Sequence, residues 1–191
     1  KQLWTRWLDS DVGHSFRSSP VAVAAALVAL ACLLAAVFAG WVSPHDPFDL
    51  TRLELLDARL PPAWAPEGSA NYPLGTDDQG RDMLSAVIHG LRISLIVGLA
   101  SVAASAVVGV ALGLLAGFAG GWVDALLMRV CDVMLSFPPI LTALLIAGVA
   151  RSLLPNAHAS VAFAVLVLAI SLSGWVQYAR TVRGSTLVER N

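Results

Sequence analysis

Four long stretches without a charged side chain constrain this chain more than any other feature of its sequence. They cover residues 20–42, 93–123, 133–150 and 152–179. About 20 apolar residues in a helix rise far enough to cross the roughly 30 Å hydrocarbon core of a bilayer. All four stretches are long enough to cross, the third with the least margin. The sequence therefore predicts an all-α membrane protein, a helical bundle with four spans.

Composition favours a membrane protein over a soluble one. Hydrophobic residues make up 57% of the 191 residues and charged residues only 13%, whereas an ordinary soluble domain is roughly 25% charged. The net charge is −1 and no basic patch is present, which argues against nucleic acid as a partner. Cys32 lies within one predicted span and Cys131 beside another, so we expect no disulfide framework.

The first stretch, residues 20–42, allows two interpretations. Arg17 precedes it and residues 37–39 resemble a cleavage site, as in a signal sequence. The apolar core of a signal sequence is typically about 7–15 residues long, and this stretch is much longer, which favours an uncleaved span. Residues 1–19 then form a cytoplasmic segment with a short interfacial helix. The apolar residues of that helix are Leu3, Trp4, Trp7 and Leu8.

Charges beside the spans orient the chain. With four spans, both chain ends lie on the same side of the membrane. Lys and Arg are only slightly more frequent in the segments on that side than in the segments on the opposite side. The stronger indication is Arg17 before the first span and Arg180 and Arg183 after the last, because positive charge next to a span stays in the cytoplasm. We therefore expect both ends in the cytoplasm and residues 43–92 in a periplasmic loop.

A leucine stripe within this loop predicts an amphipathic helix. In FDLTRLELLDARL the leucines recur at helical spacing, and Pro61 and Pro62 would end the helix. This helix could lie on the membrane surface or pack against the bundle, and the first interpretation is preferred. The stripe consists of Leu50, Leu53, Leu56 and Leu60.

Small residues recur every four positions along the second span and form what we call the small-residue ladder. Apolar helices in lipid gain little from the hydrophobic effect, so they associate through close backbone packing. The ladder therefore predicts a face pressed against another helix, although Gly and Ala are common in membrane helices in any case. Its members are Ser101, Ser105, Gly109, Gly113 and Gly117.

The ladder opens a core domain over residues 93–191, and two prolines mark its next span. Pro138 and Pro139 remove two backbone donors, so a helix either starts or bends there. The amphipathic residues 122–135 upstream predict a helix that approaches along the cytoplasmic surface and turns inward. The spans of this domain are expected at about residues 93–118, 133–150 and 157–178.

The stretch YPLGTDDQGRDMLS is unusually acidic for so apolar a chain. Thr76 and Gln79 fit a capping box, with Asp77 and Asp78 in the first helical turn, where the helix dipole favours negative charge. A calcium loop needs acids at alternating positions and a glycine at the sixth, which this run lacks. We therefore expect a helix to begin here, while Arg81 and Asp82 could bind a partner or the chain itself. The motif comprises Gly75, Thr76, Asp77, Asp78, Gln79, Gly80, Arg81 and Asp82.

The sequence contains no pattern that predicts catalysis. The four histidines lack metal-ligand spacing, and no cofactor site is expected. Ser171 and Ser173 beside Gly174 only faintly suggest an intramembrane hydrolase, because no nucleophile motif surrounds them. Lys1 is the only lysine, so a phosphate-binding loop of the G-x-x-x-x-G-K-[ST] type cannot exist. The span interiors also lack charges, which disfavours proton-driven transport.

Several stretches together resemble a known family. They are PPAW, YPLGTDDQGRDMLSAVIHGLRISLIVG, GLLAGFAGGWVDALLMRVCDVMLSFPPILTALLIAGV and WVQYARTVRGSTLVERN. Nearly the whole chain is similar to the membrane permease subunit of bacterial ABC importers for dipeptides and oligopeptides, of the second-permease type. LGTDxxGRD followed by R-I-S-L is highly specific to this subfamily, which includes nickel and glutathione importers.

The resemblance implies a subunit of about six spans in the bacterial inner membrane. It implies a homologous second permease, two cytoplasmic ATPase subunits and a periplasmic solute-binding protein as partners. The EAA coupling loop should follow residue 191, so the chain is expected to be truncated before it. Arg180, Arg183 and Glu189 are then candidates for the edge of the ATPase contact, and the 75–82 motif for binding-protein docking. A membrane enzyme and a scaffold protein are the competing interpretations.

Overall fold

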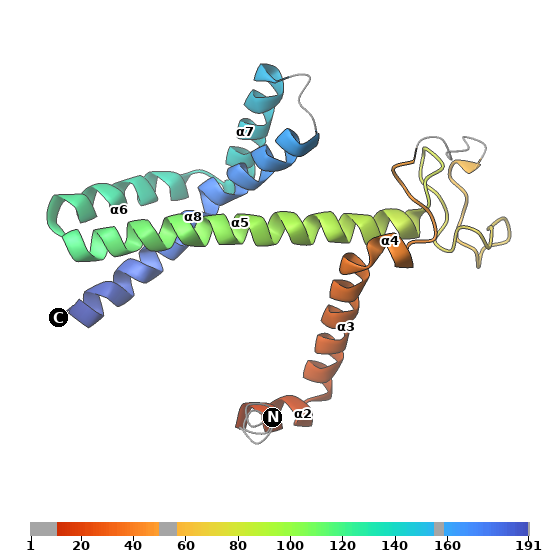
Figure 1. Ribbon diagram of the computed structural model, residues 1–191, viewed down its shortest axis with the longest axis horizontal. Coiled ribbons are helices and arrows are strands. Elements are labelled where there is room, and N and C mark those ends of the chain that lie inside the picture. The colour runs from red at the N-terminus through yellow and green to blue at the C-terminus, as the bar shows by residue number, and fades with distance from the viewer. Residues whose placement is uncertain (1–10, 50–56, 155–158, 191) are drawn as a thin grey trace. The chain divides into compact units, whose positions relative to one another are not determined.

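The computed structural model describes residues 11–49, 57–154 and 159–190, and these residues are mostly helical, apart from the loops at residues 43–49 and 57–82 (Figure 1). Within these ranges no β-strand forms, apart from a single bridge between Thr76 and Asp82. Three of the described helices are long and apolar enough to cross a membrane, and a bent pair of helices would make a fourth span. The expected all-α membrane fold is therefore confirmed.

Two compact units divide the chain, residues 1–94 and residues 95–191. The first unit begins with α2 (Asp11–Ser18), α3 (Pro20–Val37) and α4 (Ala39–Val42). Ser19 caps α3, because its hydroxyl accepts a hydrogen bond from the backbone N–H of Ala22 at 3.3 Å. Pro20 occupies the first helical position, where a backbone N–H would have no helical partner, and proline has no such N–H.

The helix α5 (Met83–Ala119) begins in the first unit and ends in the second. It includes the span expected at residues 93–118, together with the ten residues before it. Two consecutive glycines follow its end, and both have positive φ, Gly120 at 62° and Gly121 at 53°. Only glycine adopts this backbone conformation without strain, so the sharp reversal of the chain after α5 depends on this pair.

The second unit continues with α6 (Gly121–Ser136), α7 (Pro139–Leu153) and α8 (Ala159–Arg190). The axes of α6 and α7 are bent by 87° at the break between them. The break coincides with Pro138, whose missing N–H cannot continue the helix. The span expected at residues 133–150 is thus a broken one, and α8 runs well beyond residue 178, where its span was expected to end.

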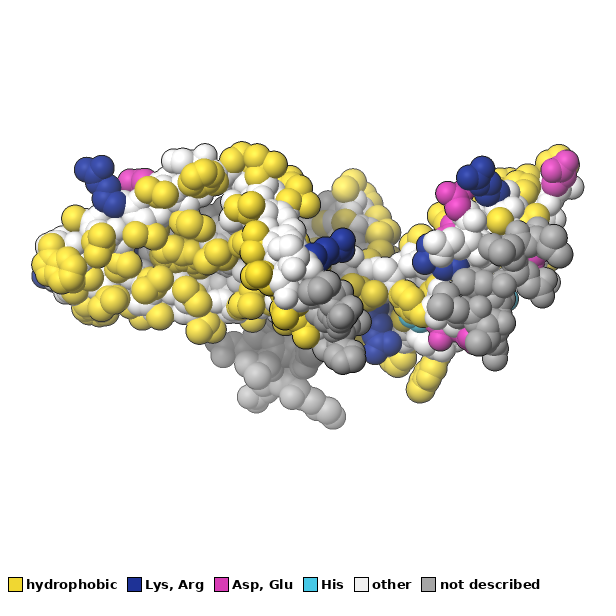
Figure 2. All heavy atoms as spheres, turned by 90° about the horizontal axis from the view of Figure 1, so that it is seen from above, with side chains coloured by type: hydrophobic (Ala, Val, Ile, Leu, Met, Phe, Trp, Pro, Cys, Tyr) yellow, Lys and Arg dark blue, Asp and Glu magenta, His cyan; other side chains and the backbone are white. Residues whose placement is uncertain are grey.

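A small core lies where α5, α6 and α8 meet. Its buried members are Cys131, Trp175, Val176 and Ala179, with Leu112, Met128 and Met134 packed against them. Most other large hydrophobic side chains in the described residues are exposed, and Figure 2 shows them spread over the surface of the helices. A surface of this kind suits lipid or neighbouring helices as its surroundings.

Candidate functional site

The motif at residues 75–82 forms a compact loop organised by Asp77. The backbone N–H groups of Gln79 and Arg81 donate to Asp77 Oδ1 at 2.8 and 2.9 Å, and Arg81 Nε donates to Oδ2 at 2.7 Å. Burial raises the pKa of Asp77, but these hydrogen bonds and the Arg81 charge outweigh it and leave the pKa below its ordinary value. Asp77 therefore stabilises the loop as a carboxylate.

The capping box predicted at Thr76 is wrong. Its hydroxyl donates to the backbone carbonyl of Asp57 and accepts from the backbone N–H of Leu60, the latter at 2.8 Å. Thr76 is therefore held by a segment at least sixteen residues earlier in the chain, which local sequence patterns do not reveal. Gly80 has a positive φ of 78°, so a helix cannot run through this position from Thr76.

Asp82 is the residue that starts α5. Its carboxylate accepts from the backbone N–H groups of Leu84 and Ser85, both at 3.2 Å, and from the Ser85 hydroxyl. The backbone N–H groups in the first turn of a helix have no partner within the helix, and an acidic cap satisfies them. The Asp82 side chain is fully buried, and His45 Nδ1 lies 3.5 Å from its second oxygen. The backbone N–H of His45 also donates to Ser85 Oγ at 3.1 Å, so this cluster fixes the segment after α4 to the start of α5.

Asp78 has a third and weaker role. It forms an ion pair with Arg59 at 2.7 Å, in which both side chains are more than three-quarters exposed. Exposed pairs of this kind contribute little to stability. Each aspartate of the motif is therefore accounted for within the chain, and the described residues contain no cluster of three metal-ligating side chains.

The small-residue ladder of α5 faces α8. A Cβ on Gly109 would come within 2.5 Å of the Trp175 carbonyl oxygen, and one on Gly113 within 2.6 Å of the Ala179 carbonyl oxygen. A Cβ on Gly117 would meet the Thr186 side chain at 2.6 Å. The backbones therefore approach as closely as glycine alone permits.

Serines form the other half of this interface. Ser105 Oγ donates to the Ser171 carbonyl at 3.3 Å, and Ser171 Oγ donates to the Ser101 carbonyl at 3.2 Å. Beside them a Cβ on Gly174 would lie 2.6 Å from Ser105 Oγ. The hydroxyls of Ser101 and Ser173 are buried and have no hydrogen-bond partner in the described part of the chain. Ser171 thus acts as a link between helices, with its hydroxyl directed at backbone carbonyls.

The contact positions show that α5 and α8 run in the same direction. Residue numbers rise together along both helices, from Gly109 beside Trp175 to Gly117 beside Thr186. Two parallel spans require the chain to return across the membrane between them. The bent pair α6 and α7 is the segment that makes this return, which supports counting the pair as one broken span.

Ion pairs attach α6 to α8. Arg183 forms a bidentate pair with Asp124, and Arg180 Nη2 lies 2.7 Å from Asp132 Oδ1. Arg190 donates to the carbonyls of Gly117 and Phe118 at 3.0 and 2.9 Å, where the last carbonyls of α5 lack helical partners. The arginines predicted at the ATPase contact thus have partners within the chain, and the contact itself stays a prediction.

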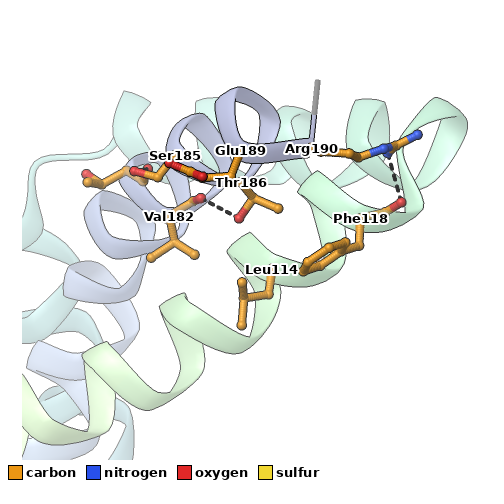
Figure 3. A pocket seen from close by; sticks show the side chains of 8 residues that line it. Leu114, Phe118, Val182, Ser185, Thr186, Glu189 and Arg190 are labelled. Atoms are coloured by element: carbon orange, nitrogen blue, oxygen red, sulfur yellow. Dashed lines mark hydrogen bonds between the residues drawn. The ribbon is translucent and has the colours of Figure 1, made fainter.

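A groove of about 420 Å³ lies between the ends of α5 and α8 (Figure 3). Leu114 and Phe118 form its α5 wall, and Glu189 stands on the α8 side. Thr186 lines the groove while its hydroxyl donates to the Val182 carbonyl at 2.7 Å. Glu189 forms no ion pair with any described residue, so it is the one member of the predicted ATPase-side group that is still uncompensated.

Comparison with known proteins gives two separate family matches. Residues 5–62 match the N-terminal transmembrane domain of oligopeptide transport permease C. Residues 109–191 match the family described as the binding-protein-dependent transport system inner membrane component. This chain belongs to that inner-membrane permease family. The second match covers α6, α7, α8 and three glycines of the ladder, whereas the 75–82 motif lies between the two matches.

Curated relatives extend the permease similarity over nearly the whole chain. The di/tripeptide transport system permease protein DppC of Pseudomonas aeruginosa is 39% identical over 93% of this chain. The glutathione transport system permease protein GsiD of Pectobacterium atrosepticum is 36% identical over 98%. The oligopeptide transport system permease protein OppC of Bacillus subtilis is 31% identical over 100%. The chain spans 55% to 56% of the length of these relatives.

Some predicted features fall outside the described part of this permease chain. They include the interfacial helix near Trp4 and Trp7, three leucines of the loop stripe, and His158. The fourth leucine of the stripe, Leu60, is described and is not helical. Asp82 at the start of α5 was missed as a cap, although an Asp directly before a run of apolar residues at helical spacing is itself a helix-start signal.

Proposed function

We propose that this chain is a transmembrane subunit of an ATP-driven importer and forms half of the translocation pathway for di- or oligopeptides. The observation that supports this most strongly is the agreement between the two family matches and the three relatives described above, which are named as permeases of peptide or glutathione transport. The close packing of α5 on α8, together with the broken return span, suits a bundle built to surround a pathway.

The proposed partners supply the energy for transport, the other half of the pathway and the delivery of the solute. Without a phosphate-binding loop, the subunit depends on two cytoplasmic ATPase subunits for energy. A homologous second permease completes the pathway, and a periplasmic binding protein delivers the solute. In this arrangement both described ends face the cytoplasm, and the 75–82 loop faces the binding protein.

The substrate class rests on the relatives alone. Di- and tripeptides are favoured, and glutathione, itself a small peptide, comes next. Nickel transport is a weaker alternative within the same family, because the described residues contain no cluster of metal-ligating side chains.

Uptake and complex formation test this function directly. The full-length protein, purified from the cells that produce it naturally, is expected to co-purify with one second permease and two ATPase subunits. A strain lacking it should lose growth on a panel of di- and tripeptides, and the intact gene should restore growth. A purified full-length protein with no ATPase partner, or unchanged peptide uptake in the deletion strain, would contradict the proposal.

A further inference from the structure

His45 joins the segment after α4 to the start of α5 through both its backbone and its ring. Its backbone N–H donates to Ser85 Oγ at 3.1 Å, and its Nδ1 lies 3.5 Å from Asp82 Oδ2. The Ser43 hydroxyl donates to the His45 carbonyl. The Asp82 side chain is fully buried, whereas the His45 side chain is 43% exposed. The imidazole can therefore exchange a proton with water while the carboxylate beside it stays out of water.

Two groups beside the His45 ring interact more strongly with a positive charge than with a neutral imidazole. The Asp82 carboxylate is one, because opposite charges at this distance attract, and more so where one of them is shielded from water. The Tyr72 ring is the other. Its centroid lies 5.3 Å from that of the imidazole, with the two planes tilted by 37°, and an aromatic ring attracts a cation within about 6 Å. A proton gained by His45 therefore strengthens both contacts.

The neighbouring acidic groups have hydrogen bonds of their own. Asp46, next to the histidine in the chain, accepts from the backbone N–H of Phe48 at 2.9 Å. Asp57 accepts from the Tyr72 hydroxyl at 3.1 Å. The carboxylate that contacts the imidazole directly is that of Asp82.

The neighbouring cationic groups contact other oxygens. Arg81 Nε donates to Asp77 Oδ2 at 2.7 Å, and His89 Nδ1 lies 3.0 Å from the Ser85 carbonyl oxygen. Among the described residues, the ion pair of the buried carboxylate is thus the one with His45.

We propose that protonation of His45 tightens the attachment of residues 43–49 to the start of α5, so that this contact responds to pH. Histidine is the side chain that ordinarily changes charge between pH 8 and pH 5. The added stability is present while the imidazole is protonated and is lost as pH rises and the proton leaves. Because residues 43–92 are proposed to face the periplasm, the pH that acts on this contact is that of the periplasm. The contact itself depends on neither the solute nor the partner subunits.

Amide hydrogen exchange of the full-length protein in detergent tests this response. The amides of residues 43–49 include that of His45, which reports directly on the hydrogen bond to Ser85. After correction for intrinsic exchange rates, their protection should be at least about threefold higher at pH 6 than at pH 8. His45→Gln keeps the backbone N–H but cannot gain the charge, so this variant should lose the difference between the two pH values.

His89→Gln is the matched control. This second histidine contacts a backbone carbonyl and not the buried carboxylate, so the variant should retain the full difference. Equal protection of the wild type at pH 6 and pH 8 would overturn the inference. So would a difference that persists in His45→Gln or disappears in His89→Gln. A full-length protein that fails to support peptide uptake would contradict the proposed function and leave this measurement unaffected, which separates the two failures.

Discussion

At the scale of single residues, neighbours in the sequence have unrelated roles. Asp77 folds its own loop, Asp78 forms a solvent-exposed ion pair, and Asp82 caps a long helix. The same contrast applies to the glycines of α5. Gly113 is in contact with the backbone of α8, whereas a Cβ on Gly98 would meet nothing within 4 Å.

Gly113→Leu should disrupt the packing of α5 on α8. The added side chain would overlap the Ala179 carbonyl oxygen, since even a Cβ would lie 2.6 Å from it. Overpacking at a close contact costs about 1–3 kcal/mol or more, so we expect at least a fivefold lower yield of monodisperse full-length protein in detergent. Gly98→Leu on the same helix is the control and should purify normally. Equal yields for the two variants would contradict close packing at Gly113.

The loop around Asp77 should lose stability in acid. The folded-state pKa of Asp77 lies below its ordinary value of 3.8, so its contribution to stability is fully present above that pH and is lost as pH falls through the lower, folded value. Amide hydrogen exchange of residues 75–82, corrected for intrinsic rates, should show constant protection from pH 7 to about 5 and a decrease below about 4. Asp77→Asn should reduce the protection already at pH 7, whereas Asp78→Asn should not. Similar protection in both variants would show that Asp77 does not hold the loop.

At the scale of helices, two features organise the second unit. The ladder lets α5 and α8 approach closely in parallel, and the prolines after α6 break the return span between them. Two ion pairs then attach the first half of that span to α8. Because the pair between Arg183 and Asp124 is bidentate and partly buried, it fixes the orientation of the two helices as well as their distance.

Breaking the pair between Asp124 and Arg183 should destabilise the packing of α6 on α8. Asp124→Ala leaves a partly buried guanidinium without its partner, which costs about 2 kcal/mol. We therefore expect a lower thermal midpoint for the full-length protein in detergent. The exchanged variant, Asp124→Arg with Arg183→Asp, should recover at least half of the loss. If each single variant is as stable as the wild type, the pair is dispensable.

At the scale of the molecule, the described helices bury few large side chains and expose many. A catalytic site would require a polar cluster aimed into a cleft, whereas the hydroxyl of Ser171 is bonded to the carbonyls of Ser101 and Val167. Helix packing is therefore the task that the structure shows for Ser105 and Ser171, the small polar residues between α5 and α8.

Ser173→Ala should leave peptide uptake within twofold of wild type. Its hydroxyl is buried and has no partner among the described residues, so its removal should cost no hydrogen bond to any of them. Uptake of a radiolabelled dipeptide by the complemented deletion strain measures this. Complete loss of function, with normal amounts of the protein in the membrane, would instead favour an enzyme with Ser173 as its nucleophile.

The sequence by itself determined the helical membrane fold, because its charge-free runs are long enough to cross the apolar core of a bilayer, where backbone groups must be paired within the segment. It also identified the ladder and the break at Pro138, since small side chains and a missing N–H act locally. Only the tertiary structure decided which helix the ladder meets, that Asp82 and not Thr76 starts α5, and which arginines the acids of α6 bind. These features depend on contacts between residues 16 to 73 positions apart in the sequence. Such contacts follow from how the segments pack together, and the residue pattern along a single helix does not reveal them.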